Sequence, residues 1–151
     1  MGGLELEQAL KLSENKSGGF FKGNISDELI VAAEKFLNIV FPESYKTFLK
    51  LKGCGSFKSK EFYGISNDNF NSGKVPNGIW LTGDERTSSK LDRYLVLIGQ
   101  SIEGYYALDT AQMKNGECPV VDAIPIGNRE SFEVVAPDFG TFFLEQIREV
   151  L

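Results

Sequence analysis

Histidine is absent from this chain of 151 residues. Its absence excludes Ser–His–Asp and Cys–His nucleophilic sites, histidine metal ligands and an imidazole pH switch. Carboxylate and lysine chemistry stay available, so the composition lowers the expectation of an enzyme without ruling one out.

Cysteine is scarce, with only Cys54 and Cys118 in the chain. A small secreted scaffold held together by disulfides carries more cysteines than this. A structural zinc site needs four ligands, which two cysteines without histidine do not supply. We interpret both cysteines as small, partly buried thiols of a reducing compartment, and we expect neither a bound metal nor a cofactor.

Long apolar runs are also missing, because no stretch approaches the ~20 residues that span a bilayer. The first seven residues lack the basic and apolar regions of a signal peptide. Leu6 stands where a myristoylation signal has Ser or Thr. These absences predict a cytoplasmic protein that has no membrane partner.

The remaining composition is that of one folded domain. Hydrophobic residues make up 42% of the chain and charged residues 25%, which is the balance of an ordinary globular protein. A length of 151 residues also matches single natural domains. We therefore interpret residues 1–151 as a single domain without a linker or an internal repeat.

Helical periodicity marks both ends of the chain. Apolar residues at helical spacing predict early helices over 4–14, 26–40 and 42–53. Ser26 is the expected N-cap of the second helix, and Asp138 is the expected N-cap of a final helix that runs to Leu151.

Strand patterns fill the region between these helices. Short apolar runs predict strands at 61–65, 79–82, 93–99, 104–108, 119–121 and 132–136. The run 93–99 is apolar on both faces, which favours a central strand. Asn115-Gly116 is a strong turn signal, whereas 67–78 and 83–90 are polar and predict loops, the second of them mobile.

The order of helices, then strands, then one helix indicates an α+β fold instead of an alternating α/β fold. We expect N-terminal helices, a mixed or antiparallel sheet of about five to six strands, and a C-terminal helix packed on that sheet.

The charge is uneven along the chain. Residues 1–75 carry 9 acidic and 10 basic side chains, whereas residues 76–151 carry 12 acidic and 6 basic ones. An acidic protein is repelled by phosphate backbones, so we expect no direct nucleic-acid partner. The acidity either attracts a basic protein partner or only improves solubility.

No acidic residue belongs to a recognisable catalytic motif. Paired carboxylates could do acid–base work or bind a metal, but isolated ones are usually turn formers, caps or solvated charges. We therefore predict no catalytic residue and no metal ligand among the candidates Asp84, Glu85, Asp92, Glu103, Asp109 and Asp122. Two further patterns fail: Gly53 to Lys58 lacks the spacing of a phosphate loop, and Asn67, Asn69 and Asn71 lack the other positions of a calcium loop.

Three aromatic residues are candidate binding anchors. Tyr105 and Tyr106 are adjacent on a predicted strand, so their side chains point to opposite faces, one inward and one outward. Trp80 and one of the tyrosines are either anchors of an interface or ordinary core residues.

An ordered set of short motifs runs through residues 25–151. The set contains a helical Glu, Leu-Asn and Phe-Pro steps, Tyr-Lys and Phe-Leu pairs, two glycine turns and a Phe-rich final helix. Its residues are Glu34, Leu37-Asn38, Phe41-Pro42, Tyr45-Lys46, Phe48-Leu49, Gly53-Cys54-Gly55, Phe62-Tyr63-Gly64, Ile98-Gly99, Glu103-Gly104-Tyr105-Tyr106, Asp109, and Ala136 to Leu144. This ordered set resembles the signature of the SUKH superfamily, the Smi/Knr-like domains.

The resemblance implies an α+β fold and a binding role without catalysis. Bacterial members look like cytoplasmic immunity proteins that neutralise a cognate toxin, often a nuclease, and fungal relatives act as interaction modules in cell-wall regulation. The resemblance and the charge together predict a basic toxin as partner. Three readings stay open: an immunity protein, a regulatory interaction module, and a carboxylate-based hydrolase that would need two converging carboxylates in a cleft.

The acidic excess places the expected partner-binding surface in the second half of the chain. Acidic and aromatic side chains at the centre of an interface with a basic protein would carry most of its affinity. The residues expected to form this surface are Trp80, Asp84, Glu85, Asp92, Glu103 and Tyr105.

Overall fold

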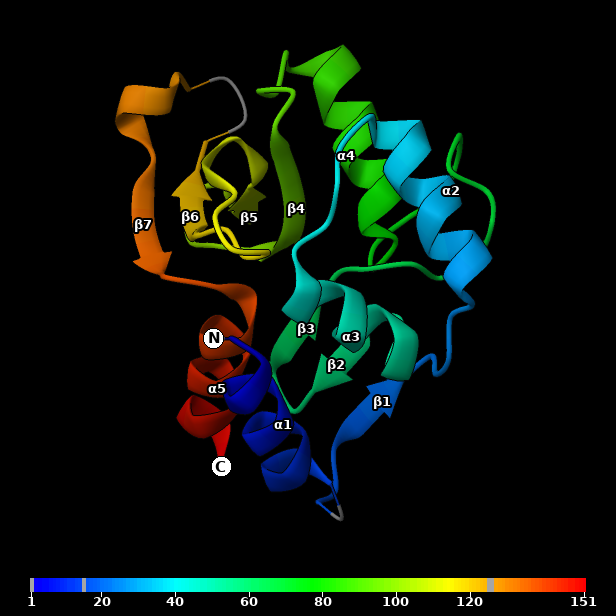
Figure 1. Ribbon diagram of the computed structural model, residues 1–151, viewed down its shortest axis with the longest axis vertical. Coiled ribbons are helices and arrows are strands. Elements are labelled where there is room, and N and C mark those ends of the chain that lie inside the picture. Colours follow the sequence, from blue (N-terminus) through cyan, green and yellow to red (C-terminus); the bar gives the residue numbers. More distant parts are fainter. Residues whose placement is uncertain (1, 15, 125–126) are drawn as a thin grey trace.

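The computed structural model describes residues 2–14, 16–124 and 127–151, and in this part of the chain it contains five α-helices and seven strands (Figure 1). The helices are α1 (Gly2–Ser13), α2 (Asp27–Leu37), α3 (Glu43–Leu51), α4 (Gly78–Ser88) and α5 (Phe139–Val150). There are also two short 3-10 helices among the described residues: η1 (Thr110–Gln112) follows β5, and η2 (Arg129–Ser131) precedes β7.

The strands form two antiparallel sheets. The smaller sheet has the order β1-β2-β3, with the strands Gly19–Phe21, Gly55–Phe57 and Lys60–Phe62. The larger sheet has the order β4-β5-β6-β7, with the strands Leu95–Gln100, Tyr105–Asp109, Val120–Ala123 and Glu133–Ala136. The α+β class is confirmed, but the described residues hold seven strands in two sheets where the sequence predicts five or six in one.

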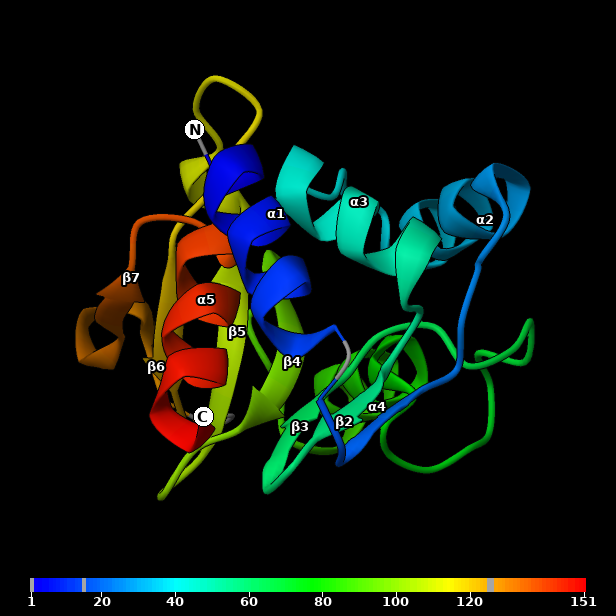
Figure 2. The same cartoon turned by 90° about the horizontal axis from the view of Figure 1, so that it is seen from below.

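Helices cover both faces of the larger sheet. On one face, α5 lies against the sheet and α1 lies beside α5 (Figures 1 and 2), and the centroids of the Tyr106 ring of β5 and the Phe142 ring of α5 are 5.0 Å apart. On the other face, α4 packs on β4, and the Tyr105 hydroxyl reaches Glu85 of α4. The adjacent tyrosines do point to opposite faces, but the expected division into one inward and one outward residue is wrong, because each face carries a helix and both side chains are half-buried.

Local signals explain the ends of two helices. The Ser26 and Asp138 side chains accept hydrogen bonds from the N–H groups of Leu29 and Thr141, so both predicted N-caps are confirmed. These caps satisfy N–H groups that have no partner within the first turn of a helix. Asn38 ends α2 in the left-handed conformation that a helix C-terminus favours.

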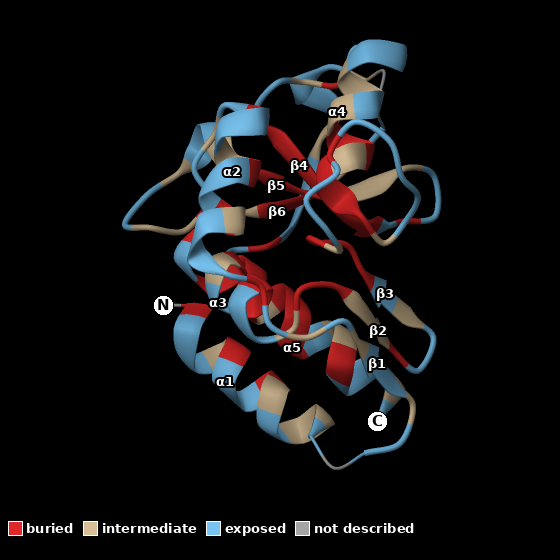
Figure 3. Ribbon diagram, turned by 90° about the vertical axis from the view of Figure 1, so that its right-hand side faces the viewer, coloured by how far each residue is buried: buried red, intermediate tan, exposed pale blue. Residues whose placement is uncertain are grey.

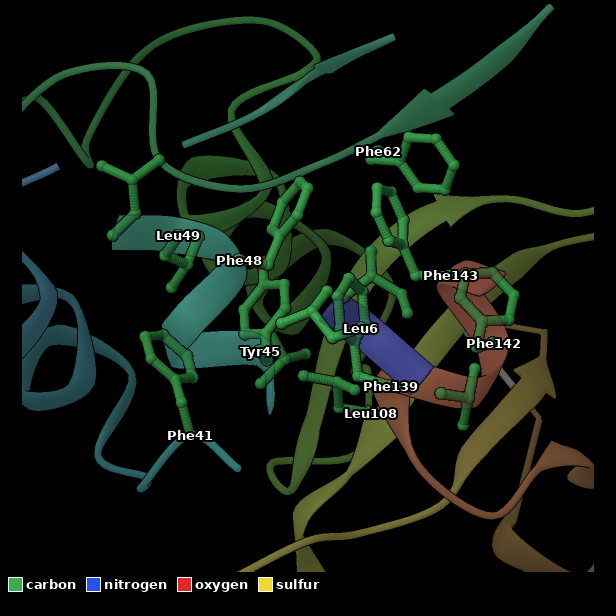
Figure 4. Close-up of a cluster of buried hydrophobic side chains, with 14 of the residues drawn as sticks. Leu6, Phe41, Tyr45, Phe48, Leu49, Phe62, Leu108, Phe139, Phe142 and Phe143 are labelled. Carbon is green, nitrogen blue, oxygen red and sulfur yellow. The ribbon is translucent and has the colours of Figure 1, made fainter. Parts of the chain in front are cut away.

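A cluster of aromatic rings joins α3, α5 and the smaller sheet (Figure 4). The ring centroid of Phe48 in α3 lies 6.1 Å from that of Tyr45 and within 5.3 Å of those of Phe139 and Phe143. The ring centroids of Phe62 and Phe143 are 4.7 Å apart. Each fully buried aromatic ring removes a large apolar area from water, and edge-to-face contacts add further stability. This cluster is the centre of the main core, and Figure 3 shows the buried residues gathered where helices face sheets.

The strand β4 is buried on both faces, as its composition predicts. Val96 and Ile98 belong to the main core, whereas Leu95 and Leu97 belong to a second apolar cluster beneath α4. The prediction that this strand is central is wrong, because β4 stands first in the strand order. Its outer edge is covered all the same, since the Tyr63 N–H donates to the Ile98 carbonyl at 2.9 Å.

The prediction of a strand at 79–82 and a mobile loop at 83–90 is wrong, because α4 occupies most of both segments. The Asn77 side chain caps the helix by accepting from Trp80 N. The Thr82 hydroxyl donates to Gly78 O at 2.7 Å and accepts from Leu97 N of β4 at 3.0 Å. These tertiary contacts offset the weak helix propensity of a segment that contains glycine and threonine.

The strands β1 and β2 are missing from the sequence prediction. Each has only three residues, one of them glycine. They form by pairing with each other across more than 30 residues of chain, for example Gly19 with Phe57. Strands of this length have too few positions to show the alternation of apolar and polar residues by which a strand is predicted.

Both cysteines are free and buried. Burial raises the pKa of the Cys118 thiol to about 12, with the charges of Asp109 and Glu117 acting in the same direction. This thiol is therefore protonated at neutral pH and is no nucleophile. Among the described residues, no helix is both long enough and apolar enough to cross a membrane.

Candidate functional site

Several acidic side chains of the second half serve the fold. Asp138 caps α5, Glu117 accepts two hydrogen bonds from Ser44, and Glu149 pairs with Lys60 at 2.9 Å. The number of acids in the sequence therefore overstates how many of them are available for contacts outside the fold.

Asp92 also has an internal partner. Its carboxylate lies 3.1 Å from Arg129, which also pairs with buried Asp109. These two carboxylates raise the pKa of the Arg129 guanidinium. Of the six residues predicted to bind a partner, Asp92 is set apart in this ion-pair network, which links the segment before β4 to the end of β5.

Glu85, Glu103 and Tyr105 come together in one concave region, which we call the acidic hollow. It has a volume of about 420 Å³, within the ~300–1,000 Å³ range of small-ligand sites. The C-terminal end of α4, the β4–β5 turn and the end of β6 form its walls. Its lining residues are Glu85, Ser89, Gln100, Ser101, Ile102, Glu103, Gly104, Tyr105 and Ile124.

The acidic hollow holds two carboxylates, and none of its described lining residues is basic. Within the described residues, Asp84, Glu85 and Glu103 form no salt bridge. Charges inside a concave wall focus the local potential, which raises the local concentration of cations. The hollow is therefore suited to a cationic group.

Glu85 is held rigidly at the wall of the acidic hollow. Its Oε1 accepts from the Ser89 hydroxyl at 2.6 Å, and its Oε2 accepts from the Tyr105 hydroxyl at 3.0 Å. Burial raises the pKa of Tyr105 to about 12, helped by the hydrogen bond to Glu85 and by the charges of Glu85, Tyr63 and Asp84. The neutral phenol is therefore a fixed hydrogen-bond donor. Both carboxylate oxygens of Glu85 are occupied as hydrogen-bond acceptors, which disfavours a role as a catalytic base.

Asp84 and Trp80 both belong to α4, but they have different surroundings. Asp84 is exposed and directly precedes Glu85, and its charge contributes to the raised pKa of Tyr105, but the described lining residues of the hollow do not include it. Trp80 packs half-buried against the second apolar cluster. Its main contacts are therefore internal, although part of the ring stays accessible.

The β4–β5 turn, residues 101–104, forms a projecting tip beside the acidic hollow. Ser101 organises the tip, since its hydroxyl donates to Asp122 at 2.7 Å and accepts from Gly104 N at 3.1 Å. A side chain at Gly104 would approach the Ala123 carbonyl to 2.2 Å, so the turn requires glycine there. Ile102 is fully exposed at the tip.

Ile102 is the residue of this surface that the sequence prediction misses. Its only signal is one large apolar residue within the polar turn Gln100 to Gly104. Covering a fully exposed isoleucine makes binding more favourable, by about 25 cal/mol for each Å² of apolar area removed from water.

The described residues hold no group of three or more potential ligands that could bind a metal ion. What they present is a surface with one concave acidic wall and one projecting apolar tip. Such a combination of charge and apolar anchor is typical of protein recognition.

Fold and surface together define a small α+β domain with a concave surface lined by carboxylates. The family model SUKH_5, described as SMI1-KNR4 cell-wall, matches residues 6–148. The chain therefore belongs to the SUKH family, which confirms the resemblance stated from its motifs and fits a binding or immunity type of role.

The residues that carry the family resemblance mostly hold the fold. Glu34 accepts from Phe41 N at 2.8 Å and fixes the link between α2 and α3. The buried Tyr45 hydroxyl donates to the Tyr63 carbonyl at 2.9 Å. A side chain at Gly64 would meet the Gly53 carbonyl at 1.9 Å, so the two turns can approach closely only with glycine there. Family membership therefore accounts for the scaffold, and the acidic hollow lies on it.

Proposed function

We propose that this chain is an immunity protein that neutralises a cognate nuclease-type toxin by binding it directly, without catalysis. The acidic hollow is the observation that carries this proposal, because its described lining residues include two carboxylates and no basic side chain. Nucleases that bind phosphate backbones present basic surfaces, which complement such a hollow. A bound immunity protein then blocks the toxin by steric and electrostatic exclusion of its substrate.

Three further observations support binding over catalysis. Both oxygens of Glu85 already accept hydrogen bonds from protein groups. Asp92 and Asp109 converge, but on the guanidinium of Arg129. Ile102 presents an apolar anchor next to the acids, and interfaces derive most of their affinity from such desolvated anchors.

The test is capture of partners from native lysate on the tagged protein, with washes at low and at high salt. We expect one stoichiometric basic protein, which is toxic when expressed alone and harmless when co-expressed with this chain. The variant Asp84→Lys with Glu103→Lys should lose this partner and the protection. The variant Glu28→Lys with Glu145→Lys changes net charge equally at exposed sites outside the hollow and should keep both.

Two results would contradict the proposal. Equal loss of capture in both double variants would show that net charge acts and the hollow does not. Several weakly bound housekeeping proteins, none of them toxic, would identify a regulatory interaction module of the same fold.

A further inference from the structure

A second hollow lies on the other side of the β4–β5 tip, and we call it the aromatic hollow. It has a volume of about 520 Å³ and shares Gln100, Ser101 and Ile102 with the acidic hollow. Its other lining residues are Ser59, Lys60, Glu61, Tyr106, Phe142, Gln146 and Glu149. Figure 2 shows the β2–β3 and β4–β5 turns projecting at the same side as the C-terminal end of α5.

The alternation of side chains along β5 places the two hollows on opposite faces of the larger sheet. Tyr105 lines the acidic hollow and Tyr106 lines the aromatic hollow. Ile102 stands at the ridge between them and belongs to both. A partner that covers Ile102 therefore has access to both hollows at once.

The aromatic hollow has an aromatic floor and acceptor groups on its walls. The half-exposed Tyr106 ring lies 5.0 Å from Phe142 at an interplanar angle of 58°. Glu61 is exposed and forms no salt bridge among the described residues. Glu149 binds Lys60 through Oε1, and its Oε2 accepts a long hydrogen bond of 3.5 Å from Gln146 Nε2. Two carboxylates against one lysine leave the hollow with a formal charge of −1.

This combination fits a guanidinium group better than an ammonium group. A guanidinium is planar, stacks on aromatic faces, and presents five N–H donors in a fixed fork. The hollow offers carboxylate oxygens at Glu61 and Glu149 and side-chain carbonyl oxygens at Gln100 and Gln146. A lysine ammonium would use the charge but not the planar surface.

We propose that the aromatic hollow is the arginine-binding pocket of the same docking surface, so that the partner straddles the β4–β5 tip with a cation in each hollow. The proposal rests on the proposed function in one respect, namely that the arginine belongs to the basic partner. Charge complementarity and the residues shared by the two hollows support a single partner over two.

The proposal is tested without the partner, by titrating ¹⁵N-labelled protein with N-acetyl-arginine methylamide and, separately, with N-acetyl-lysine methylamide. We expect amide shift changes confined to the lining segments 59–61, 100–102, 106, 142 and 146–149 at millimolar concentrations of the arginine compound. The lysine compound should bind about fivefold more weakly, the factor that corresponds to the ~1 kcal/mol of an exposed cation–π contact.

Two variants separate charge from stacking. Glu61→Gln and Tyr106→Leu should each weaken arginine binding about fivefold, whereas Glu145→Gln, on the same helix as Glu149 but outside the hollow, should not change it. Glu61 is exposed, so its variant keeps the fold. Absent shifts at the lining residues, equal binding of both compounds, or unchanged binding in Glu61→Gln would overturn the proposal.

The outcome is distinguishable from that of the proposed function. Loss of partner capture in Asp84→Lys with Glu103→Lys, without arginine binding by the second hollow, would support the proposed function and refute this inference. Arginine binding that depends on Glu61, without capture of a basic toxin, would support the arginine pocket and contradict the proposed function.

Discussion

Ser44 is a small buried residue on which three segments depend. Its hydroxyl donates to Glu117 Oε1 at 2.8 Å and accepts from Gly140 N at 3.2 Å. It therefore joins the start of α3 to the segment before β6 and to the first turn of α5. We expect Ser44→Ala to be among the most destabilising substitutions of a single hydroxyl in this protein.

The magnitude follows from the two bonds that are lost. A hydrogen bond to a carboxylate contributes about 1.5–3 kcal/mol, and a buried N–H left without a partner costs about 1–3 kcal/mol. The expected loss of unfolding free energy is therefore about 3 kcal/mol. In a chain of this length each kcal/mol lowers Tm by about 2–4 °C, so we expect a decrease of about 6–12 °C.

The loss should depend on pH. Burial raises the pKa of Glu117, and the hydrogen bonds from Ser44 oppose that rise. In Ser44→Ala the folded-state pKa of Glu117 rises further, so the variant binds this proton at higher pH than the wild type. The deficit in stability is then largest above the folded-state pKa of Glu117 and shrinks as pH falls through it.

Urea unfolding followed by the fluorescence of Trp80, the only tryptophan, measures this deficit at neutral and at acidic pH. Thr47→Ala is the control, because Thr47 lies on the same helix and its hydroxyl makes only an exposed bond to Glu43 O. A deficit for Ser44→Ala below 0.5 kcal/mol, or one of the same size at both pH values, would refute the reasoning.

Two further predictions concern the helix crossing and the acidic hollow. Gly140→Ala should lower Tm strongly, because a Cβ there would lie 1.9 Å from Gly2 O, whereas Gly3→Ala, with open space around it, should not; equal Tm values would contradict the close α1–α5 approach. Tyr105→Phe should lose stability less steeply than the wild type as pH rises from 10 to 12. Tyr105 keeps its proton to a pKa of about 12 in the folded protein but only to ~10 when unfolded, and the urea midpoint across this range measures the difference.

The sequence predicts the helices at both ends well because their signals are local. Ser26 and Asp138 satisfy N–H groups within three residues of themselves, and the apolar stripes of α2 and α5 lie on single helices. The Asn115-Gly116 turn is confirmed for the same reason: both residues have the positive φ that this dipeptide favours.

The sequence prediction fails in the middle of the chain, because contacts between residues distant in sequence determine the secondary structure there. Thr82 of α4 is fixed by Leu97 N of β4, and β1 exists only because β2 pairs with it. Helix propensity and strand patterning are weak priors that such contacts override.

The candidate site divides along the same line. Composition and charge by themselves determine an acidic, histidine-free domain, and the motifs determine its family. Which acids are available is decided by tertiary structure, because an ion pair depends on the distance between two charged groups: Asp92 meets Arg129 at 3.1 Å, whereas Glu85 and Glu103 form no salt bridge among the described residues. The exposure of Ile102 and the different surroundings of Tyr105 and Tyr106 on the two sheet faces likewise depend on where α4 and α5 cover the sheet. Long-range packing alone determines those positions.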